Sequence, residues 1–147
     1  MYLEEFYYIE IGNFLSLFIL HLIVMKKYKV IVAGGRNYND YINVKSYLYP
    51  LKIYCENNNL ELVIVCGMAT GADSLGLRFA EENNLEILKY PADWNKYGKR
   101  AGYLRNYQMG EIADSAIVFW DGKSPGTKMM IDIMNNFNKT VKIVRYE

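Results

Sequence analysis

The chain has 147 residues, of which 52% are hydrophobic and 22% are charged, so it is long and apolar enough for one domain with its own core. This composition excludes an intrinsically disordered chain, and the net charge of +1 gives no reason to expect a nucleic-acid partner. The two cysteines, Cys55 and Cys66, form no CxxC pair, which argues against a disulfide framework or a zinc site. Free cysteines are typical of the cytoplasm, where we expect the protein.

Residues 1–24 differ from the rest of the chain. Phe14–Val24 is apolar except for Ser16 and His21, but it is shorter than the ~20 residues of a membrane-spanning helix. The acidic residues before it are unlike the basic start of a secretion signal. We expect Met25 to be the initiator and residues 1–24 to be a start-site error, with an oligomerising helix or a weak membrane anchor as alternatives. Residues 25–147 would then form a single domain.

The domain alternates apolar strands with amphipathic helices. Tyr28–Ala33 is continuously apolar, which is typical of a parallel strand covered on both faces. Asp40 is expected to cap a helix in which Pro50 causes a kink or a break. A second strand is expected at about 61–66, and it leads into a glycine-containing loop.

The same alternation continues to the C-terminus. Asp73 is expected to cap a helix over 73–83, and 85–90 is the third strand. The long aromatic and basic loop at 91–102 favours an ordered lid, and a helix follows over 103–113.

The last elements complete the order βαβαβαβαβ. A fourth strand is expected at Ser115–Trp120, a helix capped by Thr127 follows, and Thr140–Arg145 is the fifth strand. Right-handed crossovers place helices on both faces of a parallel sheet. The sequence therefore predicts an α/β, Rossmann-like three-layer fold with a five-stranded, mostly parallel sheet.

Four loops follow the carboxyl ends of strands, where parallel sheets bind ligands at a topological switch. The loops expected to converge there are Gly34–Asn37, Gly67–Asp73, Pro91–Arg105 and Trp120–Thr127.

The loop Gly67–Asp73 lies between an apolar strand and a helix. This arrangement directs backbone N–H groups and a helix N-terminus at one point, which attracts phosphate. Ala72 stands where the phosphate loop of NTPases needs lysine, and the fingerprint Gly-x-Gly-x-x-Gly is absent. A tight turn without a ligand is the alternative.

Five motifs stand in order along the domain: Gly34-Gly-Arg36, Gly67-x3-Gly-Ala-Asp73, Pro91-Ala-Asp-Trp94, Arg105-Asn106 and Trp120-Asp-Gly-x-Ser-x-Gly-Thr127. Together they resemble the YspA-type branch of the SLOG superfamily, also known as the DUF2493 family, over about residues 29–145. The resemblance implies a Rossmann-like fold that binds nucleotides or nucleotide-derived ligands. Relatives include sensors of NAD-derived signals and cytokinin-activating phosphoribohydrolases. The glutamate of the phosphoribohydrolase motif is absent after Gly126-Thr127, which argues against N-glycosidic hydrolysis.

The candidate ligand-binding residues lie in these loops. Glycines allow close backbone approach to phosphate, hydroxyls donate to it, and arginines bind it through two hydrogen bonds. Aromatic rings offer faces for a base, and Asn106 could bind a ribose or a base edge. Asp121 could bind ribose hydroxyls or a metal. The set is Gly34, Gly35, Arg36, Gly67, Thr70, Gly71, Ala72, Asp73, Trp94, Arg105, Asn106, Trp120, Asp121, Ser124, Gly126 and Thr127. For each, turn geometry, helix capping or ordinary surface exposure is the alternative.

His21 is the only histidine, so the domain has neither a histidine base nor a His/Cys metal cluster. We expect no catalytic residue, metal or cofactor, but a binding protein for a nucleotide-derived signal such as ADP-ribose. It would act as a sensor or, in a phage, as a sequestering protein. A hydrolase of nucleotide-type substrates and a subunit with a vestigial pocket are the alternatives. By analogy with similar folds we expect a homodimer or higher homo-oligomer, with no nucleic-acid or membrane partner.

Overall fold

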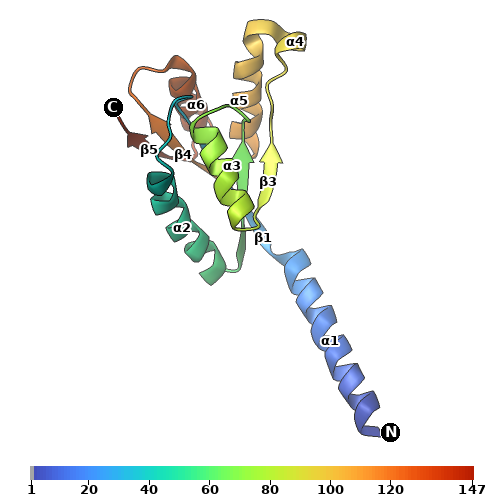
Figure 1. The fold of residues 1–147 in the computed structure, drawn as a ribbon. Coiled ribbons are helices and arrows are strands. Elements are labelled where there is room, and N and C mark those ends of the chain that lie inside the picture. Colours follow the sequence, from blue (N-terminus) through green and yellow to red (C-terminus); the bar gives the residue numbers. More distant parts are fainter. Residues whose placement is uncertain (1) are drawn as a thin grey trace.

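The structure, a computed structural model, describes the backbone of residues 2–147 and the side chains of residues 10–21 and 25–147 (Figure 1). In chain order the elements are α1 (Tyr2–Val24), β1 (Lys26–Gly34), α2 (Tyr41–Asn57), β2 (Leu60–Cys66), α3 (Ala72–Glu82), β3 (Glu86–Lys89), α4 (Trp94–Tyr97), the 3-10 turn η1 (Gly98–Arg100), α5 (Ala101–Ile112), β4 (Ser115–Trp120), α6 (Pro125–Asn136) and β5 (Thr140–Arg145).

The strands form one five-stranded sheet in the order β3-β2-β1-β4-β5, and all neighbours are parallel. Val30 of β1 is paired with Ile64 of β2 on one side and with Ser115 of β4 on the other. This confirms the predicted Rossmann-like α/β fold. The chain first builds the sheet outward from β1 to β3 and then returns to place β4 on the other side of β1. The topological switch therefore lies between β1 and β4.

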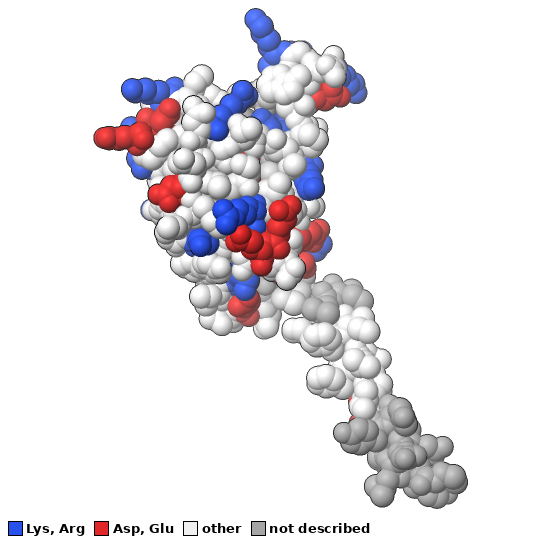
Figure 2. Space-filling model, in the orientation of Figure 1, with Lys and Arg blue, Asp and Glu red and all other residues white. Residues whose placement is uncertain are grey.

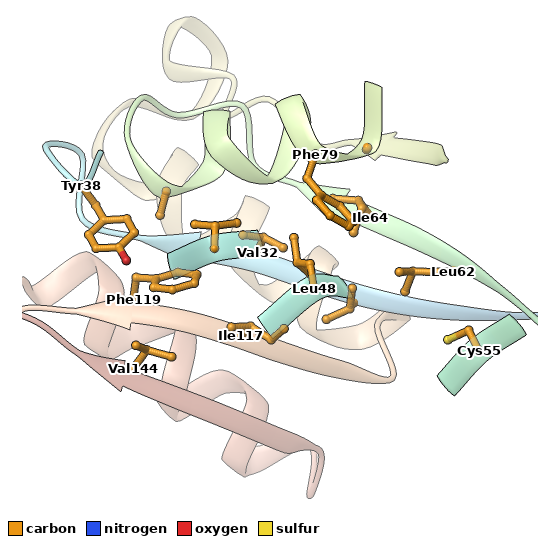
Figure 3. Packing of buried hydrophobic residues seen from close by; sticks show 14 residues of the cluster. Val32, Tyr38, Leu48, Cys55, Leu62, Ile64, Phe79, Ile117, Phe119 and Val144 are labelled. Atoms are coloured by element: carbon orange, nitrogen blue, oxygen red, sulfur yellow. The ribbon is translucent and has the colours of Figure 1, made fainter. Parts of the chain in front are cut away.

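Helices cover both faces of the sheet and make three layers. Val32 and Ile64 point to the face covered by α2 and α3, where Leu48 and Phe79 are buried against them (Figure 3). Alternate strand residues point to the opposite face, where Met109 of α5 and several α6 side chains are buried. Burying one such side chain contributes about 1.5–3 kcal/mol, so these two clusters hold the layers together.

Helix α2 begins as predicted and passes through its proline without a break. The Asp40 Oδ1 atom accepts a hydrogen bond from the Asn43 backbone N–H at 2.9 Å, which confirms the expected N-cap. The helix is a single element from Tyr41 to Asn57, so of the predicted kink or break at Pro50 the break does not occur. Pro50 and Ser46 are exposed, and water can bind the carbonyl that the proline leaves unpaired.

Two other capping predictions are wrong. Helix α3 has Gly71 at its N-cap, and α6 has Ser124 at its N-cap with Pro125 following. Asp73 and Thr127 therefore lie inside the first turns, where both are buried. The N-cap is the last residue before the backbone takes up helical dihedral angles. The presence of a short polar residue does not show where this change occurs.

The predicted lid loop is mostly helical. Its residues form α4, η1 and the start of α5, and Asp93 caps α4 by accepting from the Lys96 backbone N–H at 3.0 Å. Helix α5 starts at Ala101, two residues before the predicted position. In Figure 1 this segment stands at the end of the molecule to which the strands point.

Helix α1 extends away from the domain (Figure 1). Phe14 and Leu17 are 69% and 67% exposed, and the Phe14 and Phe18 rings lie 6.5 Å apart. Among the residues that the structure describes, no helix is long and apolar enough to cross a membrane. The side chains of residues 1–9 and 22–24 lie outside the described part, and the start-site hypothesis stays a prediction.

Candidate functional site

Two adjoining cavities lie beyond the carboxyl ends of the strands. The first has a volume of about 310 Å³ and is formed mainly by the loops after β2 and β3. The second, of about 240 Å³, extends to the start of α6. Arg36, Ala69, Trp94 and Arg105 line both cavities. We call this shared region the waist and the two cavities together the cleft.

The loops expected to converge all contribute to the cleft. Of the predicted binding residues, those that line it are Gly34, Arg36, Gly67, Thr70, Asp73, Trp94, Arg105, Asn106, Ser124, Gly126 and Thr127. The meeting point follows from the parallel sheet, because every strand delivers its carboxyl end to the same edge. The binding roles of these residues stay predictions.

Arg105 is the best-anchored cation of the cleft. The Nη1 atom donates a hydrogen bond to the Gly67 carbonyl, and Nε donates to Asn106 Oδ1 at 2.8 Å. Burial lowers the pKa of the guanidinium, while the nearby Asp73 carboxylate opposes that shift. An arginine remains charged under such shifts, so the waist carries a fixed positive charge.

Asp73 is a carboxylate that is only 5% exposed. Its Oδ2 atom accepts a hydrogen bond from the Ala69 backbone N–H at 3.3 Å. Burial raises the pKa of this carboxyl, and the Ala69 hydrogen bond and the Arg105 charge oppose the rise. A Cβ on Gly67 would lie 2.8 Å from both Asp73 Oδ2 and Arg105 Nη1, so only glycine fits between them.

Buried polar groups and an open helix end line the second cavity. Asn106 and Thr127 are 7% and 5% exposed, and Thr127 Oγ1 donates to Ser124 Oγ at 3.1 Å. No hydrogen bond found among the described residues uses the Asn106 Nδ2 atom. None of the side chains that the structure describes caps α6, and a Cβ on Gly126 would meet nothing within 4 Å. Backbone and amide donors are therefore available to an anion or a hydroxyl there.

The charge around the cleft is mainly positive. Arg36, Lys99 and Arg105 line it, and Asp73 is the carboxylate among its lining residues. Figure 2 shows basic side chains at the upper end of the molecule, where α4 lies, with acidic side chains beside some of them. A concave site with such a balance attracts anionic ligands.

Three predicted residues pack against one another outside the cleft, and their binding roles stay predictions: Gly35 in the loop after β1, and Gly71 and Ala72 at the start of α3. The Gly35 carbonyl accepts a hydrogen bond from the Ala72 N–H at 3.2 Å, so this N–H at the start of α3 is not free for phosphate as we expected. Gly71 has φ +77°, and a Cβ there would lie 2.1 Å from the same carbonyl. Gly35, Gly71 and Ala72 join two loops by close packing and do not line the cleft.

Trp120 and Asp121 shape the loop before α6 and also do not line the cleft. The Trp120 Nε1 atom donates to the Ser124 carbonyl at 3.1 Å, and the Arg145 guanidinium lies 5.2 Å from its ring. Asp121 Oδ1 accepts from the Ser124 and Lys123 N–H groups at 2.8 and 2.9 Å, which lowers the pKa of the carboxyl. The ribose or metal role expected for Asp121 has no support in this arrangement. Among the described residues, no three His, Cys, Asp or Glu side chains gather as a metal site.

Among the lining residues outside the predicted set, Lys99 and Met68 bear most directly on ligand binding. Lys99 lies in the second cavity, and its position in a basic loop between glycines was the available signal. Met68 lines the first cavity with φ +62°, a conformation uncommon for a residue with a side chain. No sequence pattern pointed to Met68.

Fold and site together define a Rossmann-like domain with a cationic cleft at the topological switch. The chain belongs to the YspA, cpYpsA-related SLOG family, whose family model matches residues 28–97. It is 34% identical over 106 residues to the Gene 61 protein of Mycobacterium phage D29, covering 68% of this chain and 82% of that protein. No solved structure matches. Membership of this family indicates a nucleotide-related ligand.

Proposed function

We propose that the protein binds a nucleotide-derived ligand, ADP-ribose or another NAD-derived signal, in the cleft at the carboxyl edge of the sheet. The observation that carries the proposal is the convergence of Arg36, Lys99 and Arg105 on a cleft at the topological switch. Family membership supports a nucleotide-related ligand, and the cations favour its phosphates.

The dimensions of the cleft support a ligand with several parts. Functional pockets for small molecules have volumes of about 300–1,000 Å³. The first cavity alone reaches the lower end of this range, and the second adds about 240 Å³ across the waist. The exposed Trp94 ring lines both cavities and offers a stacking surface. A nucleoside diphosphate with a further sugar would use both.

Retention of the ligand, for sensing or sequestration, is the proposed outcome of binding. The cleft offers cations, amide donors and an aromatic face, which are groups that hold a nucleotide in place. The relative in Mycobacterium phage D29 is the reason for including sequestration of a host signal.

A second candidate function is hydrolysis of a nucleotide-type substrate, and Asp73 is the observation that favours it. A buried carboxyl with a raised pKa beside a cation is the kind of group that acts as a general base. An Asp73→Asn variant would keep the shape of this side chain and remove its ability to take up a proton.

Both functions are tested by incubating the protein with ADP-ribose, NAD, AMP and ADP, with Mg²⁺ present. Thermal shift and calorimetry report binding, and chromatography of the recovered ligand reports turnover. The proposal expects saturable binding of ADP-ribose or a related compound, recovered intact. Product formation that is lost in Asp73→Asn would favour the hydrolase, and a panel without any binding would overturn both.

A further inference from the structure

A third cavity lies beside the cleft, between α5 and α6. It has a volume of about 210 Å³ and is lined by Tyr103, Tyr107, Ile133, Asn136 and Phe137. Tyr103 also lines the second cavity of the cleft, so the third cavity adjoins the cleft at the first turn of α5. A ligand that fills the second cavity can therefore continue into the third.

Three aromatic rings form one wall of the third cavity. The ring centroids of Tyr103 and Tyr107 are 6.3 Å apart, and those of Tyr107 and Phe137 are 5.2 Å apart. The two tyrosines lie one turn apart on α5, which separates them by about 6 Å along the helix axis. Tyr103 and Tyr107 are 49% and 43% exposed. Aromatic surface that is contiguous and open to this extent is typical of a binding site.

The third cavity differs in charge from the cleft that it adjoins. None of the described residues that line it carries a charged side chain, whereas the three cations of the cleft all line the second cavity. Lys139 lies near the third cavity, 5.3 Å from the Phe137 ring, but its Nζ atom donates to two carbonyls of α5. The phosphates of a ligand therefore belong in the second cavity, and a planar ring without negative charge belongs in the third.

We infer that the third cavity holds the nicotinamide end of an NAD-type dinucleotide whose phosphates lie in the cleft, an inference that rests on the proposed function. Nicotinamide is a single small ring, and this cavity is smaller than either cavity of the cleft. In NAD⁺ the ring is a cation, and the faces of tyrosine and phenylalanine rings attract cations. The carboxamide of nicotinamide matches the side-chain amide of Asn136, because each amide has both a donor and an acceptor.

The test is a calorimetric comparison of NAD⁺ with ADP-ribose, with chromatography of both ligands after the titration. The two ligands share the adenosine, the diphosphate and the second ribose, so the ratio of their Kd values reports the nicotinamide ring. We expect NAD⁺ to bind about 10-fold more tightly, a factor typical of one ring stacked on an aromatic side chain. Equal or tighter binding of ADP-ribose overturns this inference alone. Failure of both ligands to bind overturns the proposed function and the inference with it.

A matched pair of variants assigns the difference to the third cavity. Tyr107 lines this cavity and neither cavity of the cleft. Tyr107→Leu removes the ring, so the ratio of the two Kd values should fall toward one. Tyr107→Phe keeps the ring, so the ratio should stay close to that of the native protein. Each variant is compared with itself on the two ligands, so a loss of stability does not affect the ratio.

The same variants distinguish a ligand from a second copy of the chain as the occupant of the third cavity. An unchanged ratio in Tyr107→Leu would contradict the inference. If this variant also sediments with a lower mass than the native protein, the aromatic wall is an interface between two copies and not a nicotinamide site.

Discussion

Arg105→Ala is expected to weaken ADP-ribose binding strongly. Arg105 lies at the waist of the cleft, and hydrogen bonds to Gly67 and Asn106 fix the orientation of its guanidinium. A side chain held in this way loses little conformational freedom when it binds a phosphate. The alanine variant removes both the charge and the donors that point into the cleft.

The magnitude follows from the kind of contact that is lost. A hydrogen bond to a charged group contributes about 1.5–3 kcal/mol, and each 1.4 kcal/mol corresponds to a factor of ten in Kd. We therefore expect Kd to rise about 10- to 100-fold. Arg105→Lys keeps the charge but loses the planar fork, so its loss should lie between those of the alanine variant and the native protein.

Isothermal titration calorimetry with ADP-ribose measures the effect, and thermal unfolding confirms that each variant is folded. Arg100→Ala is the matched control, because Arg100 is an exposed arginine of η1 that lines neither cavity. Its Kd should change by less than about twofold, since an exposed charge at a distance is screened. A folded Arg105→Ala protein that binds as tightly as Arg100→Ala would refute the assignment of the phosphate to the waist.

Four further predictions address the fold, the site and the assembly. Gly71→Ala should lower the free energy of unfolding by about 1–3 kcal/mol, because a residue with a Cβ is strained at φ +77° and clashes with the Gly35 carbonyl. The added methyl group of Gly126→Ala meets open space within the cleft. Urea unfolding should therefore show unchanged stability, while calorimetry should show weaker ligand binding. Equal losses of stability in Gly71→Ala and Gly126→Ala would contradict this prediction. The fold raises the pKa of Asp73 above 3.8, so the protein is more stable when this carboxyl is protonated than when it is ionised. This contribution to the free energy of unfolding is present at low pH and is lost as the pH rises through the raised pKa. Asp73→Asn should therefore raise the unfolding temperature more at pH 7 than at pH 4, and an equal gain at both pH values would argue against this linkage. The expected homodimer predicts a sedimentation mass of twice the chain mass, and a monomer at micromolar concentration would exclude it.

The strands and their order were predictable because each is a continuous apolar run between helices with a clear apolar face. The convergence of the four loops followed from parallel strands alone. The helix starts were harder to place, since Asp73 and Thr127 are residue types that often cap helices but here lie one or more positions inside them. Pro50 was expected to disturb its helix, yet packing of the buried face holds the helix together.

Long-range contacts explain why only part of the site could be read from the sequence. Gly71 fits the glycine pattern of a phosphate-binding loop. In the structure, however, its positive φ and the lack of a Cβ allow it to pack closely on the loop after β1. The Arg145 guanidinium, from β5, lies beside the Trp120 ring, and this contact joins segments that are far apart in the sequence. Asp121 satisfies the amides of its own loop. Lys99 entered the cleft only because η1 carries it there, a turn that no periodicity revealed.

Mass spectrometry of small molecules released by heat from the protein purified from cells tests the central claim most directly. The native protein and Arg105→Ala are prepared side by side from the same cells. We predict a nucleotide-derived mass, with the ligand intact, that the native protein carries and the variant lacks. A nucleotide carried equally by both proteins would place binding outside the cleft, and a native protein carrying only a ligand class without phosphate would contradict the proposed function.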